Sequence, residues 1–175
     1  MPIQADTAHR AARALLAHEA PAAVALLNDE ERRRWLGHAT RLITRASWEG
    51  ARGADVPDAM RAAIAAHAAL LAAGFGLDTD PFRNVAAIVV HRGTIITRGI
   101  RPGPVRGSVT DAPQHLAGQS GANRDPLLLD WRTFQQQRNH PERGQNVVYH
   151  EFAHKLDQLD GDADGTPPLP DRAAR

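Results

Sequence analysis

The first half of the chain has the spacing of apolar residues that is typical of helices. Residues 8–18 are rich in Ala and Leu. After Asn28 and Asp29, either of which can cap a helix, apolar residues recur every three to four positions as far as residue 43. This is the period of a helix with one buried face. We expect Gly50–Gly53 to break this helix, since glycine disfavours helix interiors.

A third helix is predicted over Asp58–Ala73. Pro57 stands at its start and Gly74 follows its end. Proline is favoured at the first turn of a helix and glycine just after the last turn.

Beyond residue 80 the pattern changes to short β-branched or apolar runs, which predict strands. We expect a buried strand at Val85–Val90, to which Thr94–Thr97 pairs across the turn at Arg92-Gly93. The remaining elements are expected to be a loop at Arg98–Gly107, a weakly strand-like segment at Val109–Ser120, a second buried strand at Leu127–Leu129, and a short helix from Trp131.

A helix is expected again near the end of the printed sequence. It follows Gly144, has Asn146 as a plausible cap, and extends to about Leu159. Its apolar stripe consists of Val148, Phe152, Leu156 and Leu159. Helices combined with a few strands of mixed spacing indicate an α+β fold.

Composition narrows the function classes. The chain has 175 residues, with 21 Lys and Arg against 20 Asp and Glu, a net charge of +1. This balance gives no reason to expect direct nucleic-acid binding or an acidic membrane as partner. No apolar run reaches the ~18 residues of a spanning helix, and the N-terminus does not resemble a signal peptide. Because there is no cysteine, a metal must be held by His and carboxylate groups.

The last predicted helix carries the sequence His150-Glu151-Phe152-Ala153-His154. Two histidines four residues apart lie one helical turn from each other, so both rings can reach one Zn²⁺ ion. Glu151 projects beside the metal, where it can take a proton from the attacking water and pass it to a leaving amine. The motif therefore predicts a zinc site with His150 and His154 as ligands and Glu151 as general base.

Two carboxylates near this motif, Asp157 and Asp160, each allow more than one role. Asp157 is ~10 Å further along the helix than His150, so accepting a hydrogen bond from a ligand imidazole suits it better than binding zinc. A solvated Asp157 is equally compatible with the sequence. Asp160 stands six residues after His154, where one class of zinc peptidases has a third ligand, but the glycine that lets the chain turn back is replaced by Asp157.

An alternative motif overlaps the end of this helix. The residues from Asp160 to Gly165 match the opening of a calcium loop, and Asp171 falls at its twelfth position. Three prolines crowd the second half of that loop, so a polar turn that closes the helix is the better interpretation. Among other histidines, we expect His67 to be a core or interface residue, and we place His91, His115 and His140 near loops.

The active-site helix resembles the signature of the Mlc titration factor A family of zinc-dependent peptidases. Similarity extends from about Leu27 to the end of the chain. It is carried by Gly144–Asp157, by Gly161, Gly165 and Pro167-Pro168-Leu169, and more diffusely by Gly118-Gln119-Ser120, Pro126–Trp131 and the helix around Asp58, Met60 and Arg61.

The resemblance implies a zincin-like α+β fold and a cytoplasmic zinc peptidase, chiefly an aminopeptidase, that acts on peptide substrates. It also implies that His150 and His154 hold the zinc and that Glu151 is the general base. Because members of the family include a regulator that binds a transcriptional repressor of sugar uptake, a non-catalytic protein that sequesters such a repressor is the alternative function.

The resemblance leaves the third ligand unassigned. In the family a Glu from a helix beyond the Pro-Pro-Leu segment completes the zinc site, and no Glu follows Glu151 in this chain. We therefore expect residues 28–175 to be the N-terminal portion of a zincin-like peptidase domain without its C-terminal closing part, and residues 1–27 to be a variable segment. The chain by itself is expected to be catalytically inactive.

Overall fold

The computed structural model describes residues 13–93, 95–97, 101–102, 109–110, 114–116, 118–120 and 126–160, with backbone alone from 95 to 120. Residues 13–18 are helical. The other elements, in chain order, are η1 (Ala22–Leu26), α2 (Asp29–Arg45), β1 (Ser47–Gly50), η2 (Ala51–Gly53), α3 (Asp58–Leu70), β2 (Ala87–His91), β3 (Ile95–Thr97), β4 (Arg101–Pro102), β5 (Val109–Thr110), β6 (Gln114–Leu116), β7 (Gly118–Ser120), β8 (Leu127–Asp130), α4 (Trp131–Asn139), η3 (Pro141–Arg143), α5 (Val147–Asp157) and η4 (Gln158–Asp160).

Helix α2 begins with a reciprocal cap. The Asn28 side chain accepts a hydrogen bond from the Glu31 backbone N–H at 2.9 Å, and the Glu31 carboxylate accepts from the Asn28 N–H at 3.0 Å. Together these bonds satisfy two of the donors that a helix start leaves unpaired. The predicted apolar face is confirmed, because Trp35, Ala39 and Leu42 are buried.

Helix α3 is buried over most of its length and packs against α2. Its alanines allow close approach, and the Trp35 indole N–H of α2 donates to the Ala66 carbonyl at 2.8 Å. The helix ends at Leu70, not at the predicted Ala73. The following backbone N–H groups bond to carbonyls three residues back, as in Leu71 to Ala68 at 3.1 Å, so the last turn tightens out of the α-helical pattern.

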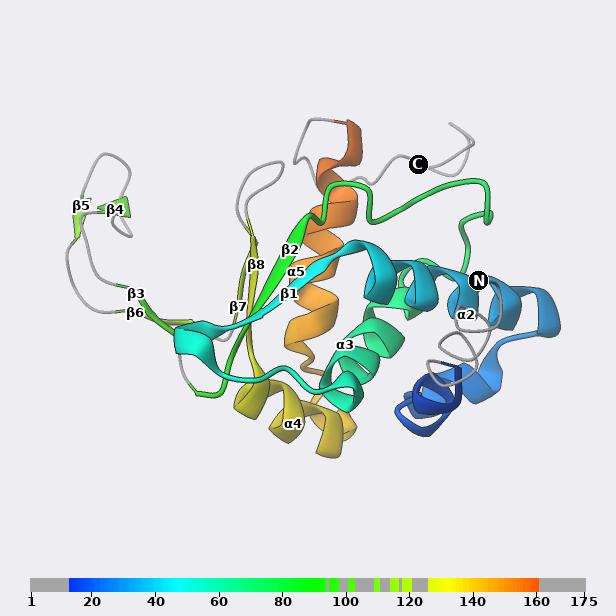
Figure 1. The fold of residues 1–175 in the computed structure, drawn as a ribbon, viewed down its shortest axis with the longest axis horizontal. Helices are drawn as coiled ribbons and strands as arrows, with labels where there is room; N and C mark the ends of the chain where they lie inside the picture. Colours follow the sequence, from blue (N-terminus) through cyan, green and yellow to red (C-terminus); the bar gives the residue numbers. More distant parts are fainter. Residues whose placement is uncertain are drawn as a thin grey trace, which may run out of the picture.

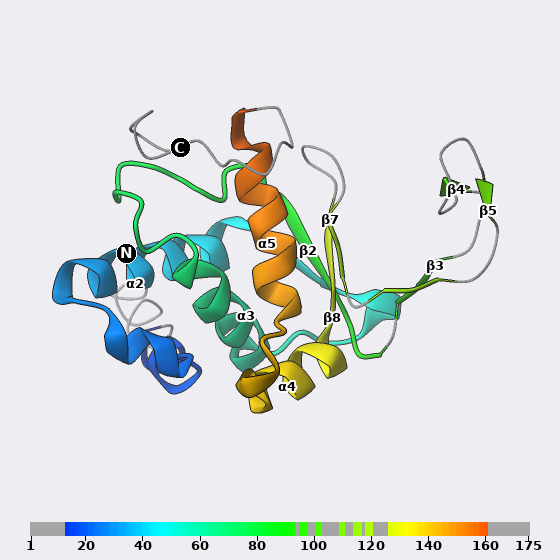
Figure 2. The ribbon, with the colours of Figure 1, turned by 180° about the vertical axis from the view of Figure 1, so that it is seen from behind.

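The sheet is mixed, with the strand order β1-β2-β8-β7. Strands β1, β2 and β8 are parallel, and β7 runs antiparallel to β8 at one edge. In Figure 1 the sheet lies to the left, α3 and α2 lie to the right, and α5 stands between them. Figure 2 shows the same order from behind, and α5 packs against β7 and β8. The α+β class is therefore confirmed.

Two expectations are wrong, one about strand pairing and one about the end of the second helix. Ile95–Thr97 does not form a hairpin with the buried strand, because both edges of β2 are taken by β1 and β8, and β3 pairs instead with β6. Gly50–Gly53 does not terminate the second helix either, since α2 ends at Arg45 and the chain then forms β1.

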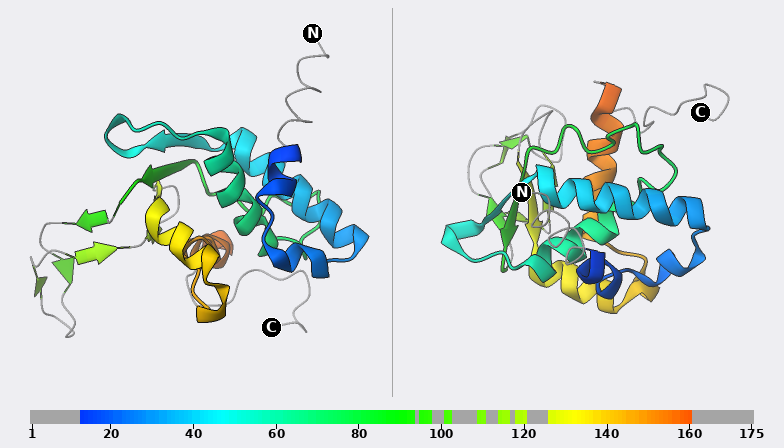
Figure 3. Two further views of the ribbon diagram at one scale, coloured as in Figure 1. Left: turned by 90° about the horizontal axis from the view of Figure 1, so that it is seen from below. Right: turned by 45° about the vertical axis from the view of Figure 1, so that its right-hand side comes forward.

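The segment expected to be strand-like contributes three strands, β5, β6 and β7. Within the expected loop, Arg101–Pro102 forms β4, which pairs with β5; the rest of that loop lies outside the described residues. The paired strands β3 and β6 extend away from the four-stranded sheet (Figure 3, left).

The core lies between the sheet and the helices. Ile88, Val90, Leu127 and Leu129 of β2 and β8 are 0–1% exposed. The N-terminal region contributes Leu16, which is fully buried. No helix among the described residues is long and apolar enough to cross a membrane.

Candidate metal centre

The helix that carries the predicted motif, α5, is fixed at its start by local contacts. The Asn146 side-chain oxygen accepts hydrogen bonds from the N–H groups of Val148 at 3.0 Å and Tyr149 at 3.2 Å. Just before it, Gly144 adopts a left-handed conformation with φ 65°, which glycine takes without strain. The predicted cap is confirmed. The α-helix ends at Asp157 and continues as η4 to Asp160.

One side of α5 belongs to the core. Val148 and Phe152 are fully buried and Leu156 is 6% exposed. The Phe152 ring meets Phe82 edge-on at 5.2 Å between centroids. This is the predicted apolar stripe, and it holds the helix in a fixed rotation about its axis.

The opposite side of α5 presents His150 and His154, both exposed. Their Nε2 atoms are 3.2 Å apart and their rings are perpendicular, with centroids 4.6 Å apart. Two imidazole nitrogens that each lie ~2.05 Å from one tetrahedral ion are ~3.3 Å from each other. The observed spacing fits a shared zinc ion, so the residues present fit the expected metal at these two positions.

Glu151 lies on another side of the helix. At about 100° per residue, it is rotated by about 100° from His150 and about 60° from His154. Its side chain is 4% exposed, while both histidines are exposed. The arrangement gives Glu151 a sheltered position beside the histidine face, which suits proton transfer better than direct metal binding.

The structure does not bring a third ligand to this pair within the described residues. No group of three or more His, Asp or Glu side chains there is arranged to hold a metal ion. The Oδ1 atom of Asp157 is buried and has no hydrogen-bond partner in the described part of the chain. Among the described residues, this oxygen therefore accepts no hydrogen bond from His150 or His154, and it is not the solvated oxygen of the alternative interpretation. The Asp160 side chain and the calcium motif up to Asp171 lie outside the described residues.

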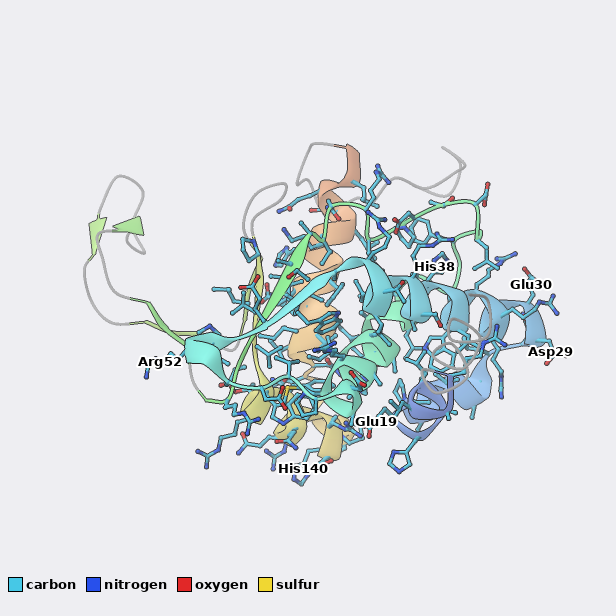
Figure 4. All side chains as sticks on the ribbon, viewed as in Figure 1. Glu19, Asp29, Glu30, His38, Arg52 and His140 are labelled. Carbon is cyan, nitrogen blue, oxygen red and sulfur yellow. The ribbon has the colours of Figure 1, made fainter. Side chains whose placement is uncertain are left out.

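The other histidines differ in their surroundings. His67 is buried as expected, its Nδ1–H donates to the Ala63 carbonyl at 2.9 Å, and burial lowers its pKa to about 4. Burial also lowers the pKa of His91. His140 is exposed, as Figure 4 shows near the bottom of the molecule, and the His115 side chain is outside the described residues.

Sequence reasoning missed His38, which lies on the core side of α2 and is 1% exposed. Its Nε2–H donates to the Phe75 carbonyl at 3.1 Å, and burial lowers its pKa. Its position on the buried stripe of α2 was the available signal. This hydrogen bond links α2 to the segment that follows α3. His38 does not contribute to the metal site.

Comparison with known proteins gives two findings. The chain is similar to the uncharacterized protein slr2042 of Synechocystis sp. (strain ATCC 27184 / PCC 6803 / Kazusa), with 34% identity over 112 residues. That match covers 64% of this chain and spans 40% of the length of the relative. Residues 2–175 match the family described as glucose-regulated metallo-peptidase M90, which agrees with the resemblance of the active-site helix to the Mlc titration factor A family. This chain therefore belongs to the glucose-regulated metallo-peptidase family.

Proposed function

We propose that this chain supplies the catalytic helix of a zinc-dependent peptidase, chiefly an aminopeptidase, with a zincin-like fold and a cytoplasmic location. The observation that carries the proposal is the 3.2 Å separation of the His150 and His154 Nε2 atoms on the exposed side of α5. Two imidazoles at that spacing can donate lone pairs to one ion, and the absence of cysteine leaves nitrogen and oxygen ligands alone.

The metal and Glu151 have separate tasks in this proposal. When bound, zinc supplies Lewis acidity, which lowers the pKa of water and polarises the scissile carbonyl. Glu151 accepts the proton of the attacking water and transfers it to the leaving amine. Its burial, at 4% exposed, keeps bulk water from competing for that proton. The fixed rotation of α5 holds the carboxylate at one angle to the two histidines.

We further propose that the substrate lies extended along β7. This strand is the edge of the sheet next to α5, and an edge strand can hydrogen-bond an added peptide strand through its backbone. Within the weakly strand-like segment Val109–Ser120, the strands β5 and β6 pair with β4 and β3, so β7 is the part that suits this role.

Zinc content of variants tests the metal site. In the full-length protein, His150→Ala and His154→Ala should each abolish stoichiometric zinc, measured by elemental analysis after dialysis. His140→Ala is the matched control, because it removes an exposed histidine that is not part of α5 and should leave zinc unchanged. Unaltered zinc in both α5 variants would refute the assignment.

A further inference from the structure

A cavity of about 470 Å³ lies between the N-terminal region, α4 and the start of α5. Its lining includes Glu19, His67, Arg138 and Tyr149, and it contains none of the three residues of the proposed metal site. Its volume is within the range of ~300–1,000 Å³ that small-molecule sites occupy. The cavity is therefore a second candidate site, independent of zinc.

The buried histidine in this cavity offers a hydrogen-bond acceptor. His67 is 5% exposed, and its Nδ1 lies 2.9 Å from the Ala63 carbonyl, which only accepts hydrogen bonds. Nδ1 therefore carries the proton, and Nε2 has a free lone pair. His67 lines the cavity, and Nε2 is not one of the buried polar atoms without a partner in the described part of the chain. Its lone pair can therefore accept a hydrogen bond from a ligand that enters the cavity and brings a donor.

Amide groups in the same lining offer donors. The side-chain oxygen of Gln137 accepts from the Val147 N–H, and that of Asn146 accepts from Val148 and Tyr149. The NH₂ groups of Gln137 and Asn146 are left to donate, and both residues line the cavity. The site thus combines an acceptor at His67 with donors at Gln137 and Asn146.

The charge of the lining is balanced. Its one acid, Glu19, and its one base, Arg138, form an ion pair at 2.8 Å with side chains that are 13% and 27% exposed. Burial raises the pKa of the Glu19 carboxyl, but the hydrogen bonds and positive charges of Arg138 and His18 together outweigh burial, and the pKa lies below its usual value. A charged ligand would have to compete with this pair, while a neutral ligand can bind beside it.

We propose that this cavity binds a neutral polyhydroxylated molecule the size of a monosaccharide. Each hydroxyl both donates and accepts, so one such molecule can donate to His67 Nε2 and accept from the two amides. The Tyr149 ring, whose centroid is 5.8 Å from that of His67, provides an apolar surface for the C–H face of the ligand. The site is a binding site without a chemical step.

Titration of the isotopically labelled chain, followed by backbone amide chemical shifts, tests the proposal. The neutral probes are glucose and myo-inositol, the zwitterionic probe is alanyl-alanine, and the anionic probe is inorganic phosphate. We expect one of the neutral probes to give saturable shifts at Asn146 and Tyr149, with a dissociation constant of about 1 mM or lower. The measurement needs no zinc, so its result is independent of the peptidase proposal.

Two variants of the short helix η1 distinguish binding in the cavity from binding elsewhere on the surface. Ala23 lines the cavity and is exposed, while Ala25 is exposed but does not line it. Ala23→Phe should weaken binding by about tenfold or more by filling the cavity, and Ala25→Phe should leave it unchanged. His67→Phe keeps the ring and removes the acceptor, and should weaken binding about three- to tenfold.

Three results would overturn the proposal. One is the absence of saturable shifts with either polyol up to about 100 mM. Another is equal binding by Ala23→Phe and Ala25→Phe, which would place the ligand elsewhere. The third is binding of alanyl-alanine or phosphate without binding of a polyol, because the cavity would then prefer charged ligands to neutral ones.

Discussion

Protonation of His67 should destabilise the fold in mild acid. The imidazole is 5% exposed, and burial lowers its pKa from 6.5 to about 4. Its ring lies edge-on to Phe134 at 4.9 Å between centroids, where a cation finds little solvation. His67→Phe removes the titrating group and retains an aromatic ring in this position.

The magnitude follows from the difference between the two pKa values. Between pH 6.5 and 4 the unfolded chain binds more protons at this residue than the folded chain, so stability rises with pH in that window. The contribution is complete above pH 6.5 and is lost as the pH falls toward 4. At ~1.4 kcal/mol per pKa unit, the total loss is about 3 kcal/mol, of which about 2 kcal/mol is lost by pH 5.

Urea unfolding at pH 8, 6, 5 and 4.5 measures this effect. The relevant quantity is the difference in unfolding free energy between wild type and His67→Phe, since other titrating groups cancel in that difference. When the pH falls from 8 to 5, the unfolding free energy of the variant should rise by about 2 kcal/mol relative to that of the wild type. His140→Gln, at an exposed position, controls for the loss of a histidine as such.

A difference that does not change with pH would refute this reasoning. It would mean that His67 remains solvated in the folded protein or that the folded state rearranges at little cost when the ring is protonated. His38, whose pKa is also lowered by burial, should contribute in the same direction. Its contribution is present in both proteins and leaves their difference unaffected.

Three further predictions concern the proposed general base, the cap of α4 and the activity of residues 1–175. Glu151→Gln in the full-length protein should keep zinc and lower the turnover number by ~100-fold or more; loss of zinc, measured by elemental analysis, would make Glu151 a ligand. Asp130→Ala should cost about 1–2 kcal/mol in thermal unfolding, because Asp130 is buried and caps α4 through the N–H groups of Arg132 and Thr133; an effect no larger than that of the exposed Asp29→Ala would contradict this. Residues 1–175 loaded with zinc should release amine from aminoacyl substrates at the background rate, since catalytic zinc needs three protein ligands; activity equal to that of the full-length protein would place the third ligand within this chain, with Asp160 the first to test.

The sequence predicted α5 well because its determinants are local. Asn146 caps the helix, and the spacing of Val148, Phe152 and Leu156 sets which side is buried. The one-turn spacing of His150 and His154 is likewise a property of the helix alone. The motif contains two metal-binding histidines and no third, so it says nothing about the position of the third ligand that the proposed zinc site requires.

Strand pairing could not be predicted with the same success. In β1, Ser47 is the partner of Ala87, forty residues away, and the strand contains Glu49 and Gly50, which have low preference for strands. Its extended conformation is a result of the long-range contact with β2. The wrong hairpin at Thr94–Thr97 has the same cause, since nearness in sequence favoured a pairing that β1 and β8 exclude.

Because α5 has a fixed orientation about its axis, few of its positions can be substituted without affecting the core or the proposed ligands. Among its eleven residues, six are buried in the core, including Glu151, and two of the exposed residues are His150 and His154. Tyr149 and Asp157 are half-buried. Ala153 is the one remaining exposed position on the helix. A protein engineer who wishes to adjust metal affinity from within this helix, without altering a proposed ligand or the core, therefore has a single residue to vary.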